Sequence, residues 1–229
     1  MFTPVELAAI ALSLRVSLLA VLCALPFAVA TAYVLARKQF VGKTALDAIV
    51  HLPLLMPPVL TGYALLVLLG KRGLIGHPLD AWFGVTFAFR WTGAVVAAGI
   101  MAFPLFVRSV RLSLEAIPRE IDEMAATLGA RPWRAFWQVL LPLSLPGIGA
   151  GAVLAFAKAL GEFGATITFV SNIPGETQTI ALAMQTLTQA PGGSAGIWRL
   201  AIVSLALSVG ALLASEWMVR RARYRMPSE

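Results

Sequence analysis

Long apolar runs are the feature of this sequence that most limits its fold. A helix that crosses the hydrocarbon core of a membrane needs about 20 mostly apolar residues. Five segments fit this description: residues 8–36, 48–70, 91–107, 143–170 and 200–219. The composition agrees, because 59% of the residues are hydrophobic and 13% are charged, whereas soluble chains have about 45–50% and about 25%. The sequence predicts one all-α membrane domain over residues 1–229. It excludes a disordered chain, a nucleic-acid-binding module and a disulfide-rich secreted domain.

The distribution of cations predicts how the chain is oriented. Arg and Lys cluster after the first, third and fifth spans, at Arg37, Lys38 and Lys43, at Arg108, Arg111, Arg119, Arg131 and Arg134, and at Arg220, Arg221, Arg223 and Arg225. Such clusters mark the cytoplasmic side of a membrane protein. Five spans then place the N-terminus outside and the C-terminus in the cytoplasm. A weak apolar stretch at 180–187 leaves a short sixth span or a re-entrant segment as the alternative.

The longest cytoplasmic segment, residues 108–142, has the pattern of two short helices. Pro118 suits a first helical turn, and the acidic residues after it suit a helix N-terminus. Gly129 is placed to end that helix in a left-handed conformation. Pro132 opens a second helix, which Pro142 is expected to close. Apolar residues fall on one face of each helix: Ile117, Ile121, Met124, Ala125 and Leu128, then Trp133, Phe136, Trp137 and Leu140.

These short helices must pack against something, because neither is long enough to be stable alone in water. Amphipathic helices with Trp and Arg often lie on the bilayer surface. Glu120, Asp122 and Glu123 argue against this, since anionic lipid headgroups repel them. A protein partner below the membrane fits the charges better.

No constellation of residues points to catalysis. His51 and His77 lie on different segments without paired carboxylates nearby. Gly42-Lys43-Thr44 resembles the end of a phosphate-binding loop, but Arg37 stands where that motif needs its first glycine. We therefore expect a chain that is not an enzyme, binds no cofactor and has no ATP site of its own.

Several motifs resemble those of ABC importer permeases of the sulfate and molybdate type. The segment from Glu123 to Gly129, followed after nine residues by Val139-Leu-Leu-Pro142, resembles their E-A-A-x3-G-x9-I-x-L-P loop, with Met124 and Val139 as conservative departures. His51–Gly62 and Leu160–Thr166 resemble sulfate and molybdate permeases. The segments 171–177 and 191–193 resemble molybdate permeases more closely. The likeness extends over nearly the whole chain.

This resemblance implies partners and a mechanism. The loop would be the coupling helix that inserts into a cytoplasmic ATPase, through Glu123, Ala125, Ala126, Gly129, Trp133 and Pro142. The permease would be a homodimer in the bacterial inner membrane. Two ATPase subunits would hold ATP and Mg, and a periplasmic or tethered binding protein would deliver the oxyanion. Molybdate is the expected substrate, with sulfate or tungstate as alternatives. An ion-coupled secondary transporter is a further alternative, but it should show an internal repeat, and none is evident.

The translocation path should offer neutral groups, because a fixed cation would trap a tetrahedral dianion. Hydroxyls such as those of Thr61, Thr166 and Thr168, together with backbone N–H groups freed at helix breaks, are the expected donors. Breaks are expected where Pro and Gly concentrate, and the candidate path or gate residues are Pro57, Pro58, Thr61, Gly161, Glu162, Gly164 and Thr166. The glycines could instead serve close helix packing. Glu162 could simply pair with Lys158 one turn away, or it could fix a helix break.

Overall fold

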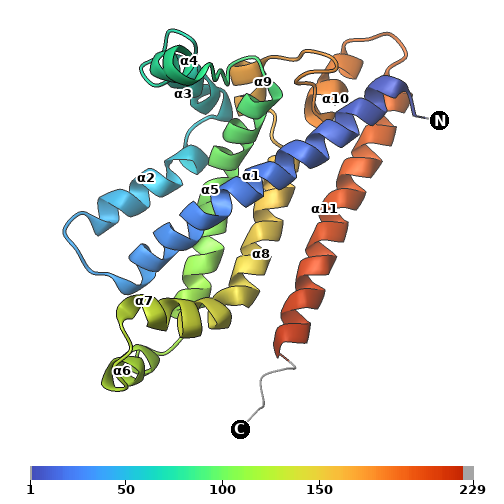
Figure 1. Ribbon diagram of the computed structural model, residues 1–229. Helices are drawn as coiled ribbons and strands as arrows, with labels where there is room; N and C mark the ends of the chain where they lie inside the picture. Colours follow the sequence, from blue (N-terminus) through green and yellow to red (C-terminus); the bar gives the residue numbers. More distant parts are fainter. Residues whose placement is uncertain (1, 224–229) are drawn as a thin grey trace.

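The computed structural model describes residues 2–223, which are built from helices without a strand in that range. The long helices run between the two ends of the molecule, and the shorter ones lie at those ends (Figure 1). The helices, in chain order, are α1 (Pro4–Arg37), α2 (Lys43–Leu55), α3 (Pro58–Leu69), α4 (Gly76–Phe83), α5 (Trp91–Glu115), α6 (Glu120–Thr127), α7 (Pro132–Ala135), the π-helical turn η1 (Phe136–Leu140), α8 (Leu141–Leu160), α9 (Gly164–Val170), α10 (Ile180–Thr188) and α11 (Ser194–Arg223).

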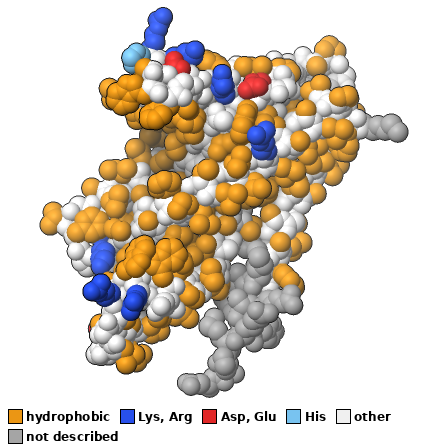
Figure 2. All heavy atoms as spheres, viewed as in Figure 1, with side chains coloured by type: hydrophobic (Ala, Val, Ile, Leu, Met, Phe, Trp, Pro, Cys, Tyr) orange, Lys and Arg blue, Asp and Glu red, His pale blue; other side chains and the backbone are white. Residues whose placement is uncertain are grey.

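Apolar helices lie in all five predicted segments, but their bounds differ. The predicted span 143–170 is wrong as a single helix, because α8 ends at Leu160 and the short helix α9 begins only at Gly164. Within residues 2–223, four helices are long and apolar enough to cross a membrane, and α2 with α3 makes a fifth if the bent pair counts as one span. The predicted span 48–70 is not straight, because α2 and α3 meet at 112°. Helix α5 continues eight residues beyond the predicted end at Val107. Figure 2 shows the apolar band that results, with charged side chains gathered above and below it.

The core is built from small residues where α1, α5 and α8 cross (Figure 1). Ala28 and Ala32 of α1 and Ala97 and Ala98 of α5 are completely buried. Small side chains let helix backbones approach closely, which matters in a bilayer because lipid is as apolar as leucine. The crossing of these three helices therefore forms the rigid centre from which the other elements project.

The start of α1 is fixed by a capping box and an ion pair. The Glu6 backbone N–H donates to the Thr3 hydroxyl at 3.2 Å, and the Thr3 N–H donates to the Glu6 carboxylate at 2.7 Å. The same carboxylate accepts from Arg199 of α11 at 2.7 Å. Glu6 is consequently buried, and it joins the first helix of the chain to the last.

Three short helices lie at the end of the molecule opposite α6 and α7: α4, α9 and α10 (Figure 1). Helix α10 occupies the weak apolar stretch for which a sixth span was the alternative. It has nine residues, whereas a crossing helix needs about 20. Its Ile180 N–H donates to the Ser13 hydroxyl of α1 at 2.7 Å, so α10 is tied to the bundle without crossing it.

Candidate functional site: a coupling loop and a pair of broken helices

The loop between α5 and α8 forms the predicted helix–glycine–helix arrangement. Helix α6 carries all three acidic residues of its sequence in its first turn. Gly129 follows α6 at φ +77°, and the next N–H, of Ala130, donates to the Ala125 carbonyl at 2.9 Å. The left-handed turn at Gly129 is confirmed. Pro118 lies two residues before α6, so its predicted place in the first turn is wrong.

The predicted end of the second helix at Pro142 is also wrong. Helix α7 runs through the π-helical turn η1 directly into α8, which gives one continuous segment from Pro132 to Leu160. Proline lacks an N–H and its ring collides with the carbonyl four residues earlier in an α-helix. The wider turn resolves this conflict, because the Leu141 N–H donates to the Phe136 carbonyl five residues back. The loop is therefore a direct extension of a span.

The loop exposes a group of large apolar side chains, which we call the coupling surface: Met124, Leu128, Trp133 and Trp137. Their exposed fractions are 58%, 87%, 70% and 49%. The rings of Trp133 and Trp137 lie 5.4 Å apart, edge to face. Phe136, which packs edge to face against Trp137, also contacts Tyr33 of α1, with the two ring centres 4.8 Å apart. Such exposed apolar clusters mark interaction sites.

The predicted coupling residues lie around this surface. Glu123, Ala126, Gly129, Trp133 and Pro142 are exposed, and Ala125 is half-buried. A side chain added at Gly129 would meet no atom within 4 Å. The small residues of the loop thus leave room for close approach from outside.

Arg37 attaches this loop to α1, which the sequence did not predict. Its guanidinium donates to the Ile117 carbonyl at 2.9 Å and pairs with Asp122 of α6 at 3.2 Å. The Arg37 side chain is only 7% exposed. In the sequence Arg37 was one cation of a cytoplasmic cluster. Its first partner is 80 residues away, so no local pattern could have revealed it.

A second ion pair joins α5 to α2 at the same end of the molecule. Arg111 donates to Asp47 of α2 at 3.0 Å and to Glu115, one turn along α5, at 2.8 Å. The His51 ring nitrogen Nδ1 lies 2.9 Å from the Asp47 carbonyl oxygen. Among residues 2–223, no group of three or more His, Cys, Asp or Glu side chains is arranged to hold a metal ion.

At the other end, the two broken helices meet at their breaks. Helix α3 begins at Pro58, directly after Pro57, and α9 begins at Gly164, after a break at residues 161–163. A Cβ atom added at Gly62 would lie 2.5 Å from the Ala165 carbonyl oxygen. One added at Gly164 would lie 2.6 Å from the Pro58 Cβ. The structure thus brings the predicted path residues together through a backbone contact that only glycine permits.

Glu162 holds the second break in place. Its carboxylate pairs with Lys158 at 2.6 Å and accepts the Ala165 N–H at 3.0 Å. The Glu162 side chain is 1% exposed, whereas that of Lys158 is 30% exposed. The sequence left two roles open for Glu162, pairing with Lys158 or fixing a helix break. Its carboxylate makes a contact of each kind, because it pairs with Lys158 and accepts a backbone N–H in the first turn of α9.

The threonine hydroxyls near the breaks are not equivalent. Thr166 donates to the Phe163 carbonyl at 2.8 Å, and Thr168 donates to the Gly164 carbonyl at 2.9 Å. The Thr61 hydroxyl is buried and has no hydrogen-bond partner in the part of the chain that the structure describes. Thr61 is therefore the hydroxyl of this group with a free donor.

The structure combines apolar spans, two of which are broken where they meet, with an exposed helical loop at the opposite end. This combination is typical of one class of protein, the multi-pass permeases of transport systems. The model of one family, "Binding-protein-dependent transport system inner membrane component", matches residues 24–224. The chain belongs to this family.

Known relatives of the chain include molybdenum transport permeases. It is 57% identical to the molybdenum transport system permease protein ModB of Escherichia coli K12, over 97% of both chains. It is 52% identical to ModB of Haemophilus influenzae, over 96% of both. The solved structure of a bacterial alginate ABC transporter, in complex with an alginate-bound periplasmic protein, has the same fold with a TM-score of 0.71. That match has 20% identity and covers 95% of this chain and 80% of the other.

Proposed function

We propose that this chain is the membrane-spanning subunit of an ABC importer that carries molybdate into the cytoplasm. ATP is hydrolysed by a separate ATPase subunit. The observation that carries the proposal is the coupling surface, which exposes large apolar side chains on a segment continuous with a span. The 57% identity to a molybdenum transport permease over nearly the whole chain supports the choice of substrate.

The coupling surface is the docking site for the ATPase, through Glu123, Ala125, Ala126, Gly129, Trp133 and Pro142. Two attachments transmit the motion of this docking site to the membrane-spanning helices. Helix α7 continues through η1 into α8, and Arg37 joins α6 to the end of α1. A displacement of the loop therefore moves two of the three helices that form the rigid centre.

The end with α6 and α7 faces the cytoplasm in this proposal, in agreement with the cations that cluster there. The N-terminus is then outside and the C-terminus inside. The opposite end, with α3, α4, α9 and α10, receives the oxyanion from a periplasmic or tethered binding protein. Two copies of the chain form the path, because five spans are too few to enclose a pore.

The contact of the broken helices forms part of this path or its gate, through Pro57, Pro58, Thr61, Gly161, Glu162, Gly164 and Thr166. A dianion that crosses the membrane must be held weakly. The pairing of Lys158 with Glu162 cancels the cation nearest to the break, and the Thr61 hydroxyl offers a neutral donor. This arrangement suits passage of an oxyanion better than its capture.

Reconstitution with the ATPase and the binding protein tests the proposal. We expect ATP-dependent uptake of molybdate into proteoliposomes, and no uptake when the ATPase is omitted. Tungstate and sulfate, supplied in the same assay, show which tetrahedral oxyanions the complex carries. Uptake that proceeds without the ATPase contradicts the assignment to ABC importers, and ATP-dependent uptake of sulfate alone contradicts molybdate as the substrate.

A further inference from the structure

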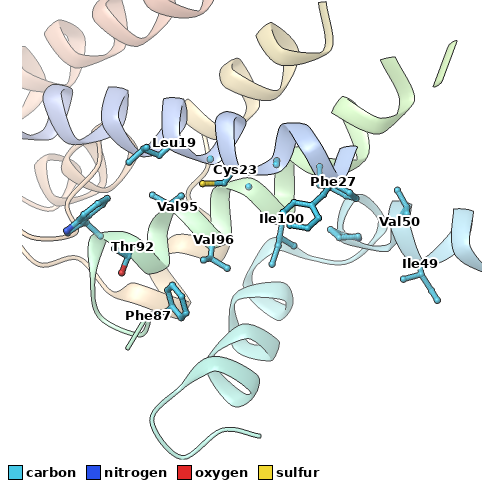
Figure 3. Close-up of a pocket in the computed structure, with 16 residues that line it drawn as sticks. Leu19, Cys23, Phe27, Ile49, Val50, Phe87, Thr92, Val95, Val96 and Ile100 are labelled. Carbon is cyan, nitrogen blue, oxygen red and sulfur yellow. The ribbon is translucent and has the colours of Figure 1, made fainter. Parts of the chain in front are cut away.

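An apolar groove runs between α1, α2 and α5, and none of the candidate path or gate residues lines it. Its volume is about 770 Å³. Leu19, Cys23 and Phe27 of α1 form one wall, Val95 and Ile100 of α5 form the floor, and Val50 of α2 closes one end (Figure 3). Nothing in the proposed transport cycle uses this groove.

The groove is apolar along its length and polar at one end. Thr92 lies at the end opposite Val50 and Ile49 (Figure 3). Trp91, the first residue of α5, also lines that end, and the Arg15 guanidinium lies 3.8 Å from the centre of its ring. Arg15 is one turn before Leu19 on α1, so it continues the stripe formed by Leu19, Cys23 and Phe27.

Arg15 is a cation without a carboxylate partner. It is exposed, and within residues 2–223 no ion pair involves it, whereas Lys158, another cation inside an apolar helix, is paired with Glu162. The start of α5 beside it has no side-chain cap, and a helix N-terminus carries a partial positive charge. The polar end of the groove therefore favours an anion.

Trp91 indicates how deep in the membrane the polar end of the groove lies. Tryptophan side chains gather at the level of the lipid headgroups, and Trp91 begins a span. From Arg15 to Phe27 the helix rises about 18 Å at 1.5 Å per residue. One leaflet contributes roughly half of the hydrocarbon thickness of about 30 Å. The groove thus has about the length of one lipid acyl chain, and Arg15 lies at the level of the lipid headgroups.

We propose that this groove binds an anionic phospholipid, with an acyl chain between α1 and α5 and the phosphate group at Arg15. Two features favour a lipid over an apolar helix of a second copy: the charge of Arg15 at one end, and a groove length close to the thickness of one leaflet. An apolar helix in the groove would leave Arg15 without an anion. The bound lipid fills the space between α1 and α2 and so supports the helix that carries Arg37.

Photoreactive lipids test this proposal in the assembled transporter. The complex with its ATPase is placed in nanodiscs containing phosphatidylglycerol or phosphatidylcholine with a diazirine in the acyl chain, and adducts are located by peptide mass spectrometry. We expect adducts within residues 19–27 and 95–103, about fivefold more from phosphatidylglycerol. This ratio corresponds to the roughly 1 kcal/mol that one Arg contributes near anionic lipid.

Matched variants separate the headgroup site from general contact with lipid. Arg15→Gln should remove the fivefold preference while adducts from both lipids persist, which also shows that the variant is folded. Arg15→Lys should retain most of the preference. Lys71→Gln, on an exposed turn outside the groove, should leave the ratio unchanged.

Two results would overturn the proposal. One is equal labelling of the groove by both lipids in the unaltered protein. The other is the absence of lipid adducts together with crosslinks from Cys23, the only cysteine of the chain, to a second copy. The second result would assign the groove to a protein helix.

Discussion

The coupling surface and the contact of the broken helices lie at opposite ends of the molecule. They differ in how far their side chains are buried and paired within the chain. At the coupling surface, Leu128 and Trp133 are more than two-thirds exposed. At the broken helices, Glu162 is buried and both of its carboxylate oxygens are hydrogen-bonded. The first region leaves large apolar side chains uncovered, whereas the second pairs its buried charge within the chain and leaves only the Thr61 hydroxyl without a partner among the described residues. Substitutions at the contact of the broken helices should therefore act mainly on stability, and those at the coupling surface mainly on transport.

The largest effect is expected at the backbone contact between α3 and α9. Gly62→Val should lower the free energy of unfolding by about 3 kcal/mol or more, because its side chain would meet the Ala165 backbone rather than a movable side chain. Thermal unfolding in detergent measures the loss. Gly149→Val is the matched control, since a side chain at Gly149 of α8 would meet nothing within 4 Å. Equal losses in both variants would show that α3 and α9 are not in close contact.

The next effect is expected at the ion pair of the second break. Glu162→Gln keeps an acceptor for the Ala165 N–H but leaves the Lys158 cation unpaired. A hydrogen bond to a charged group contributes about 1.5–3 kcal/mol, so we expect a stability loss in that range and slower release of oxyanion. The double variant with Lys158→Met should recover much of the loss. If the two single losses simply add, the two side chains do not interact.

Gly129→Val should impair transport more than stability. Its φ of +77° costs a β-branched residue about 1–2 kcal/mol, although no atom lies in the way. We expect normal insertion, weaker association with the ATPase and uptake reduced roughly fivefold to thirtyfold. Gly192→Val carries the same kind of strain at φ +74° in the segment before α11. It should leave ATPase association intact, and equal loss of association in both variants would remove the special role of Gly129.

The smallest effect is expected from Arg37→Gln. The Asp122 side chain is 36% exposed, so solvent weakens its pair with Arg37, and the loss should be about 0.5–1.5 kcal/mol, or roughly twofold to tenfold. We expect ATP hydrolysis to continue while uptake falls by that factor. Arg119→Gln, on an exposed neighbour that makes neither contact, is the control. Unchanged uptake per ATP hydrolysed in Arg37→Gln would show that α1 does not transmit the motion of α6.

The sequence predicted the features that depend on local pattern. Hydropathy located the apolar segments, although the predicted span 143–170 is interrupted after α8, and the glycine at 129 located the turn between the loop helices. Helix α5 was predicted too short because Arg108 and Arg111 end the apolar run, although charged residues continue a helix readily once it leaves the membrane. Pro142 was expected to end a helix because the π-helical turn that accommodates it leaves no signal of its own.

Long-range partners could not be predicted. The pairing of Arg37 with Asp122 and the packing of Gly62 against Ala165 join segments about a hundred residues apart in the chain, and nothing near either residue identifies its partner. The sequence suggested a break at Pro57 and Pro58, but neither the 112° angle between α2 and α3 nor the packing of α3 against α9.

Crosslinking at the coupling surface tests the central claim most directly. Leu128→Cys, in a chain whose only native cysteine is replaced by Cys23→Ser, places one thiol on the most exposed side chain of that surface. We predict a crosslink to the ATPase subunit in the membrane, with a yield that changes when ATP is bound. A thiol that forms no such crosslink, and that reacts only with reagents added from outside the cell, would contradict both the docking site and the orientation of the chain.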